Sequence, residues 1–199
     1  MAESSEFRES RSRPLALVLG LAMAALAVSF PLVPEQYRPF NFAMFGAVGL
    51  FVAARVGFWP GIGLMLGSKL LCDLLLWQQK GQDPDHLPFV TVYASFALYA
   101  IIGWTLLRRS DSAPRIGLTA LGASLAFFLV SNFISWVKQE LPYGYTLGGL
   151  IHSYEMAIPF YRGTLFGDLL FTGVLFGAHA VLVRATAGTL EPVREEVRA

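Results

Sequence analysis

Two ionisable residues of opposite sign stand four positions apart inside an apolar stretch of the chain. The stretch reads SKLLCDLLLW and contains Lys69 and Asp73. Residues four apart lie on one face of an α-helix, so the side chains can pair, although acid after base is the weaker order. Near the centre of a membrane helix each charge costs roughly 2.5–3.5 kcal/mol, so it needs a partner or a hydrated cavity. A third such residue, Asp168, stands in a separate apolar run.

Amide and aromatic residues in other apolar runs favour a functional interpretation. Several helices would bring polar groups to one outward-facing pocket that binds a small, polar, partly aromatic solute. In this hypothesis Lys69 meets an anionic or carbonyl group, while Asp73 and Asp168 accept hydrogen bonds or meet a cationic group. The other predicted contacts are the amides of Asn41 and Asn132, which orient the solute, and the rings of Trp136 and Tyr93, which cover its apolar face.

Two alternatives use the same residues differently. In the structural alternative, Lys69 and Asp73 neutralise each other, Asn132 holds Asp168, and the polar groups only lock the helices together. In the enzymatic alternative, an intramembrane enzyme acts on a lipid or prenyl substrate. Its acids, bases or metal ligands would be Asp73, Asp168, His152 and Glu155. No paired DxxD or HExxH motif accompanies these residues. We therefore predict a non-enzymatic protein without a cofactor or metal.

The connection from residue 138 to residue 162 is long enough to cover the outer mouth of a pocket. Turn signals at Pro142 and an N-cap at Thr146 predict a short helix through His152 and Glu155, which Pro159 would end. A connection of this length with aromatic and polar residues is typical of a lid. His152 and Glu155 have a spacing compatible with a metal, but two ligands on one short helix also fit side chains at the level of lipid headgroups.

The amino-acid composition predicts that these residues belong to a membrane protein. Of 199 residues, 55% are hydrophobic and 15% are charged, compared with about a quarter charged in a soluble domain. A helix needs about 20 apolar residues to cross a membrane, and continuous apolar runs exclude a β-barrel. The chain is therefore predicted to be an all-α bundle of six transmembrane helices within residues 14–184, with polar tails at 1–13 and 185–199. The predicted spans are Pro14–Val33, Phe40–Gly57, Pro60–Trp77, Val90–Leu107, Ile116–Val137 and Gly163–Val183.

The basic residues predict how this bundle is oriented. If both termini are cytoplasmic, ten arginines fall inside and four basic residues fall outside, which satisfies the positive-inside rule. The inner set is Arg8, Arg11, Arg13, Arg55, Arg108, Arg109, Arg115, Arg184, Arg194 and Arg198, and the outer set is Arg38, Lys80, Lys138 and Arg162. The arginine-flanked start also fits a cleaved secretory signal, which would remove the first 27 residues and one span. A formal net charge of +1 offers no basic patch for nucleic acid.

Small residues recur at every fourth position of the first apolar run. Ala16, Gly20 and Ala24 form a stripe against which another helix can pack closely. That helix belongs either to the same bundle or to a partner subunit. The chain contains no GxxxxGK[ST] motif, so energy for transport would come from a partner or an ion gradient.

Several short motifs recur along the apolar part of the chain. They are Pro39 with Asn41 and Phe42, Asp73, Ser131–Phe133, Pro159 with Phe160, and Gly167 with Asp168. With these motifs, the chain resembles an uncharacterised family of bacterial six-helix integral membrane proteins over about residues 38–177. The resemblance implies a membrane protein and assigns no activity.

The arrangement also resembles the substrate-binding (S) components of energy-coupling factor transporters. Those six-helix proteins capture vitamins or metal ions outside the cell and pair with a transmembrane coupling protein and two ATPases. This resemblance implies that Ala16, Gly20 and Ala24 contact the coupling protein, in place of the Ala-xxx-Ala motif of that family. The metal-binding branch carries an N-terminal His segment that Met1-Ala2-Glu3 lacks, so the resemblance implies an organic, vitamin-like micronutrient taken up across the inner membrane.

Overall fold

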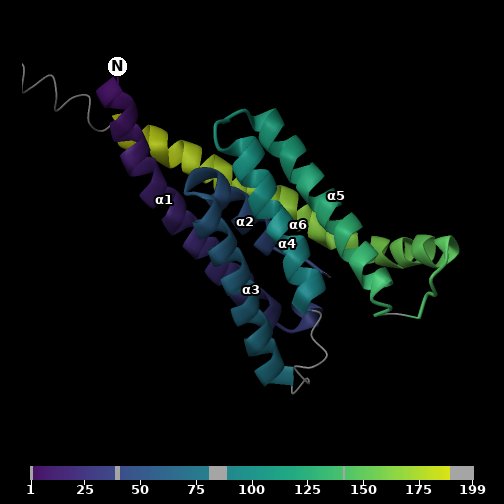
Figure 1. Ribbon diagram of the computed structural model, residues 1–199. Helices are drawn as coiled ribbons and strands as arrows, with labels where there is room; N and C mark the ends of the chain where they lie inside the picture. Colours follow the sequence, from purple (N-terminus) through teal and green to yellow (C-terminus); the bar gives the residue numbers. More distant parts are fainter. Residues whose placement is uncertain (1, 39–40, 81–88, 141, 189–199) are drawn as a thin grey trace, which may run out of the picture.

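The protein folds into a bundle of α-helices, as a computed structural model shows (Figure 1). The structure describes residues 2–38, 41–80, 89–140 and 142–188, and within these there is no β-strand. Pro39 of the sequence motif lies outside the described residues. The α-helices run alternately up and down the bundle (Figure 1). In chain order the elements are α1 (Ala2–Ser29), the short 3₁₀ helices η1 (Phe30–Leu32) and η2 (Glu35–Tyr37), α2 (Phe45–Arg55), α3 (Phe58–Lys80), α4 (Phe89–Leu107), α5 (Ala113–Val137) and α6 (Leu147–Gly188). The predicted all-α, six-helix fold is confirmed.

Four of these helices are long and apolar enough to cross a membrane, which indicates a membrane protein. The segments are Ser12–Leu32, Phe58–Gln79, Ala113–Val137 and Leu147–Thr186. Their outward faces carry large apolar side chains, such as Val18 at 63% exposure and Leu118 at 70%. Apolar side chains facing outward in such numbers are typical of a surface that contacts lipid.

The second helix is shorter than predicted. The apolar run was expected to be helical from Phe40, but α2 begins at Phe45 and has 11 residues, which is about 16 Å of rise. The reason lies in Asn41, whose positive φ of 51° interrupts the helix. A helix of this length covers about half of a ~30 Å hydrocarbon core.

The core of the bundle is α2 itself. Every residue from Phe45 to Ala54 is buried, and α2 packs against α1, α3, α4 and α6. Glycines on two neighbours allow this close packing, because a Cβ atom at Gly61 or Gly103 would overlap the backbone of α2 at Ala53 or Leu50. The shortest helix is thus enclosed by the longer ones.

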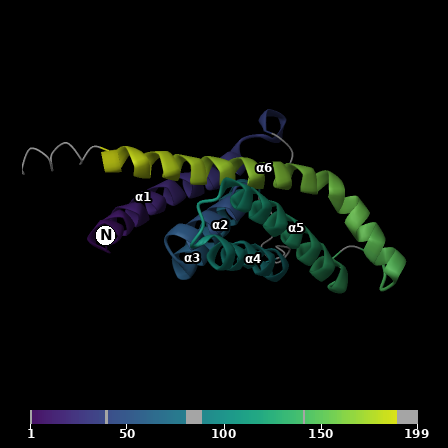
Figure 2. The same cartoon turned by 90° about the horizontal axis from the view of Figure 1, so that it is seen from above.

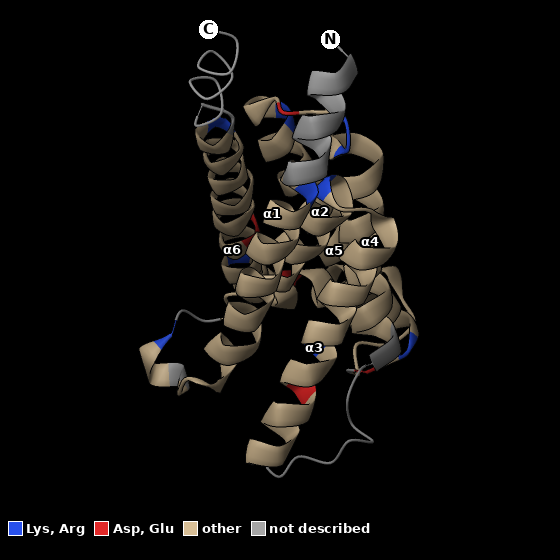
Figure 3. Ribbon diagram, turned by 90° about the vertical axis from the view of Figure 1, so that its left-hand side faces the viewer, with Lys and Arg blue, Asp and Glu red and all other residues tan. Residues whose placement is uncertain are grey.

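Arg55 gathers several helix ends at one end of the bundle, which we call the basic end. Its guanidinium donates to the carbonyl oxygens of Leu107 and Ser110, both at 2.9 Å, and pairs with Asp111 at 2.8 Å. It also lies 4.7 Å from the ring centroid of Phe176 on α6. The end of α2, the end of α4 and the last part of α6 therefore meet here, and Figure 3 shows further Lys and Arg segments at this end.

Helix α6 is longer than predicted and continues through Pro159. It was expected to begin at Gly163, after a short helix ended by that proline. Instead one helix of 42 residues runs from Leu147 to Gly188, about 63 Å by rise per residue. Figure 2 shows its N-terminal part bending beside α5. Proline removes one helical hydrogen bond, and long membrane helices tolerate this loss when neighbours support the backbone.

Candidate functional site

Lys69, Asp73 and Tyr93 meet between α3 and α4. Lys69 forms an ion pair with Asp73, and the Tyr93 hydroxyl donates to the Asp73 carboxylate at 2.8 Å. The Lys69 ammonium lies 5.6 Å from the ring centroid of Tyr93 and 6.0 Å from that of Phe45. The two charged side chains are only 18% and 13% exposed. The cluster is thus internally neutralised, as the structural alternative requires of this pair.

Asp168 lies apart from that cluster, in the centre of the bundle. It is 1% exposed and accepts a hydrogen bond from the Tyr99 hydroxyl of α4. Asn132 donates instead to the carbonyl oxygen of Phe128 in its own helix, at 2.8 Å. The prediction that Asn132 holds Asp168 is therefore wrong: the amide satisfies itself four residues back along α5.

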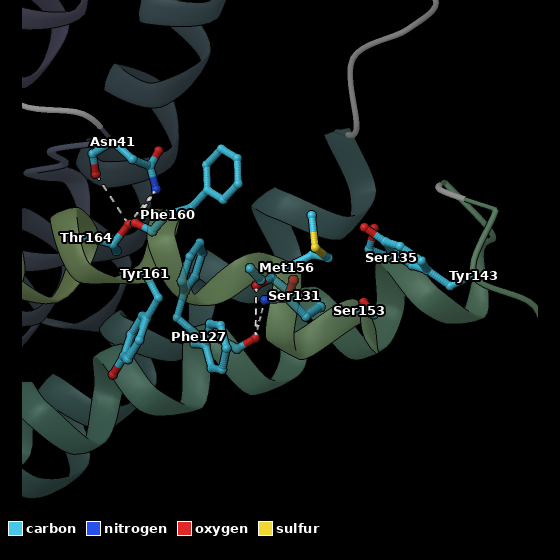
Figure 4. Close-up of a pocket in the computed structure, with 13 residues that line it drawn as sticks. Asn41, Phe127, Ser131, Ser135, Tyr143, Ser153, Met156, Phe160, Tyr161 and Thr164 are labelled. Atoms are coloured by element: carbon cyan, nitrogen blue, oxygen red, sulfur yellow. Dashed lines mark hydrogen bonds between the residues drawn. The ribbon is translucent and has the colours of Figure 1, made fainter. Parts of the chain in front are cut away.

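A cavity of about 400 Å³ lies between the second half of α5 and the first half of α6 (Figure 4). This volume is within the range of about 300–1,000 Å³ that small-molecule sites occupy. Among the residues that the structure describes, the lining combines amide, hydroxyl and aromatic side chains and contains no Lys, Arg, Asp, Glu or His. The lining residues are Asn41, Phe127, Phe128, Ser131, Asn132, Ser135, Tyr143, Ser153, Met156, Ala157, Phe160, Tyr161 and Thr164.

Only Asn41 and Asn132 of the predicted contacts line this cavity. The others lie elsewhere: Lys69, Asp73 and Tyr93 in their own cluster, Asp168 in the core, and Trp136, His152 and Glu155 outside the lining. The residues that were predicted to share one pocket thus lie in several separate places. The rotation of each helix about its own axis is the reason, because polar groups at equal depth in the membrane can face different neighbours.

Periodicity along α5 and α6 is the signal that would have identified the cavity. Phe128, Ser131, Asn132 and Ser135 recur at helical spacing on α5, and Ser153, Ala157, Phe160 and Thr164 recur on α6. Such spacing places each set on one face of its helix. A single serine or threonine in an apolar helix carries a weaker signal than a charge, although hydroxyl groups together supply most of the polar lining.

Asn41 anchors one end of the cavity. Its side-chain amide donates to the Phe160 carbonyl oxygen at 2.8 Å and to Thr164 Oγ1 at 3.0 Å. These bonds join the segment before α2 to α6 close to Pro159. A positive φ, which Asn tolerates better than most residues, orients the amide toward α6.

The connection between α5 and α6 closes the opposite end of the cavity. Trp136 donates from Nε1 to the Gly144 carbonyl oxygen at 2.9 Å, and Tyr145 donates to the Val137 carbonyl oxygen at 3.0 Å. These bonds hold the turn against the end of α5, with Tyr143 on the cavity. The predicted lid region is therefore a short turn followed by the first part of α6, which forms one wall.

His152 and Glu155 lie on the outer face of that wall. His152 Nδ1 and Glu155 Oε2 are 3.6 Å apart, and the side chains are 57% and 65% exposed. Within residues 2–38, 41–80, 89–140 and 142–188, no three His, Cys, Asp or Glu side chains converge on a common point. The four residues of the enzymatic alternative are likewise not gathered: Asp73 pairs with Lys69, and Asp168 is buried.

The small-residue stripe of α1 packs inside the chain. Ala16 is 0% exposed and Ala24 is 4% exposed, and a Cβ atom at Gly20 would overlap the Val52 side chain of α2. The intramolecular use of the stripe is thus confirmed. Contact of Ala16, Gly20 and Ala24 with a coupling protein stays a prediction, and it would need this buried face of α1 to become accessible.

Comparison with known proteins places the chain without assigning an activity. No curated protein and no solved structure matches it. A family of unknown function, DUF6580, matches residues 9–190, which is nearly the whole chain. This agrees with the resemblance to an uncharacterised family, and the chain belongs to DUF6580.

Proposed function

We propose that the protein is a membrane-embedded binding subunit for uptake of a small organic solute, with the α5–α6 cavity as its binding site. The observation that carries this proposal is the cavity of about 400 Å³ with hydrogen-bonding groups on both walls. The site is also accessible from outside the bundle, because Met156 and Phe160 of its lining are 51% and 49% exposed.

The lining restricts the chemistry of the solute. Its polar groups are amides and hydroxyls, contributed by Asn41, Ser131, Asn132, Ser135 and Thr164 among others. Aromatic rings from Phe127, Phe128 and Tyr161 supply flat apolar surface. We therefore propose an uncharged, amphipathic solute of vitamin size, with hydrogen-bonding substituents on an apolar or aromatic body. Lys69 and Asp73 form an ion pair with each other, and we do not include them among the residues that bind the solute.

We propose that the cavity opens outward in the bacterial inner membrane. The distribution of arginines supports cytoplasmic placement of the basic end, and the cavity lies toward the opposite ends of α5 and α6. In this arrangement all six helices lie within the membrane region, with α2 enclosed by the others and α4 completing the wall. Uptake would then need energy from another protein or an ion gradient, since the chain has no GxxxxGK[ST] motif.

A ligand screen with a blocked cavity tests the binding proposal. Purified protein in detergent would be heated with a library of neutral vitamins and related amphipathic compounds, and hits would be confirmed by direct binding. Ala157→Phe places a ring in the cavity, whereas Ala180→Phe places the same ring on an exposed position of the same helix. We expect Ala157→Phe to lose binding while Ala180→Phe retains it.

Two results would overturn the proposal. One is the absence of any stabilising or binding compound for the wild-type protein across the neutral library. The other is equal affinity of the wild type and a correctly folded Ala157→Phe variant. Uptake itself is tested separately, with radiolabelled solute in cells that contain or lack the co-purifying partner proteins.

A further inference from the structure

Asp168 is an enclosed carboxyl group without a cationic partner. It is 1% exposed, and no ion pair among the described residues includes it. Tyr99 donates to Oδ2, while Oδ1 is buried and has no hydrogen-bond partner. One acceptor atom in the centre of the bundle is therefore left unsatisfied.

A second unsatisfied polar atom lies beside it. Ser124 of α5 is 0% exposed, its Oγ has no hydrogen-bond partner, and it lies close to Tyr99, Tyr161 and Asp168. Within the described part of the chain, the titratable groups facing Asp168 are thus Tyr99 of α4 and Tyr161 of α6 itself. Helix α2 presents Gly46, where a Cβ atom would lie 2.5 Å from Oδ1.

An ionised Asp168 would be costly in these surroundings. Removing a carboxylate from water costs several kcal/mol even after the protein relaxes. One hydrogen bond to a charged group returns only about 1.5–3 kcal/mol. A bound proton or cation removes this deficit. The close approach of Gly46 and the Tyr99 ring leaves space for a proton more readily than for a metal ion with its several ligands.

We propose that Asp168 is a proton-binding site whose carboxyl group is neutral in the resting protein at neutral pH. A proton on Oδ1 converts an unsatisfied acceptor into a donor next to Ser124 Oγ, so both buried atoms gain a partner. The carboxylic acid form thus completes the hydrogen bonding that the carboxylate form leaves open.

Tyr161 connects this site to the α5–α6 cavity. It lines the cavity, its ring stacks on Phe128 with centroids 4.5 Å apart, and it lies close to Ser124. Figure 4 shows Tyr161 at the same end of the cavity as Thr164. Ser124 and Tyr161 therefore form a hydroxyl route by which the Asp168 proton exchanges with water in the cavity. This inference does not depend on the identity of any solute.

Infrared spectroscopy of the purified full-length protein tests the protonation state, since a carboxylic acid and a carboxylate absorb at different frequencies. At neutral pH we expect a carboxylic-acid C=O band that disappears in Asp168→Asn and persists in Asp73→Asn. Tyr99→Phe should shift the band, because the hydrogen bond to Oδ2 is lost. This second variant keeps the test decisive if Asp168→Asn does not fold.

The proton route is tested by transferring the protein into D₂O and following the deuterium-induced shift of the same band. Tyr161→Phe should slow the exchange several-fold. Tyr154→Phe, whose hydroxyl binds the Leu129 carbonyl oxygen, should leave it unchanged. Equal exchange in the wild type and Tyr161→Phe would overturn the route.

Two further outcomes would overturn the proton site itself. The first is the absence of a carboxylic-acid band assignable to Asp168 at neutral pH. The second is a band that is present in choline chloride and lost in sodium chloride at the same pH, which would identify a sodium site instead.

Discussion

Asn41 combines an unusual backbone conformation with two side-chain bonds across the bundle. Its φ is 51°, in the left-handed region that costs roughly 1–2 kcal/mol for most residues. Its amide binds the Phe160 carbonyl oxygen and Thr164. The backbone and the side chain therefore make separable contributions at one position.

Two substitutions at this position separate those contributions. Asn41→Gly removes the hydrogen bonds but accepts the positive φ, whereas Asn41→Ala removes the bonds and strains the backbone. We expect both variants to lower the free energy of unfolding, Ala by about 1 kcal/mol more than Gly. Denaturation in detergent, followed by circular dichroism, measures the difference. Equal loss in the two variants would show that the backbone conformation contributes nothing.

Lys69 and Asp73 provide a second test at the residue scale. Removing one partner leaves a poorly hydrated charge, whereas removing both leaves none. We expect Lys69→Met and Asp73→Leu to lower stability by about 1–3 kcal/mol each, and the double variant to lose less than the sum. A double-mutant cycle of unfolding free energies gives the coupling. Additive losses would contradict the ion pair.

The sequence predicts local relationships between these residues better than distant ones. The four-residue spacing predicted that Lys69 and Asp73 could share a helix face, and they form an ion pair. The partner of Asp168 could not be predicted, because it depends on the rotation of α6 against α4 and on the missing side chain at Gly46. Tyr99 shows no pattern in the sequence that distinguishes it from a packing residue.

At the scale of helices, packing around α2 depends on glycines in its neighbours. At Gly103 of α4 a Cβ atom would overlap the backbone of Leu50, whereas at Gly122 of α5 it would meet nothing within 4 Å. The same substitution at these two positions therefore separates helix contact from helix propensity.

We expect Gly103→Ala to destabilise the protein by about 1–3 kcal/mol, because α4 must move away from α2. Gly122→Ala should be neutral or stabilising by up to about 1 kcal/mol, since alanine favours a helix. Thermal unfolding of the two purified variants measures both effects. A Gly103→Ala variant as stable as the wild type would contradict the close α2–α4 contact.

Helix ends were predicted less well than helix interiors. The apolar core of each run is helical, but the end of one helix and the start of the next depend on tertiary contacts. Pro159 is a helix breaker by local rules, and yet α6 continues through it. Asn41, from a distant part of the chain, binds the carbonyl oxygen of the next residue, Phe160. Local propensity also cannot show that the first polar residues, from Ala2 onward, extend α1.

At the scale of the whole molecule, the basic end around Arg55 and the cavity lie at opposite ends of the bundle. Single cysteines can report which end faces the cytoplasm, because Cys72 is the only native cysteine and can be replaced by alanine. We expect Tyr145→Cys, in the α5–α6 turn, to react with a membrane-impermeant maleimide in intact cells. Ser110→Cys, at the basic end, should react only after permeabilisation. The reverse pattern would invert the proposed orientation.

The general architecture was predictable because composition and run length alone decide it. Four of the predicted spans correspond to long apolar helices, and the alternation of the helices follows from their short connections. The burial of α2 by the other helices was not predictable in the same way. An apolar run gives no indication of whether lipid or protein will surround it, and here ten consecutive residues of α2 are buried by protein.

The enclosure of α2 also affects the order of events during synthesis. During synthesis the 11 residues of α2 emerge from the ribosome before α6, which packs against α2 in the folded protein. Until α6 is made, α2 lacks one of its helix neighbours, and its 11 residues are too short to span the hydrocarbon core of the bilayer. The environment of α2 is therefore completed only after α6 has been made.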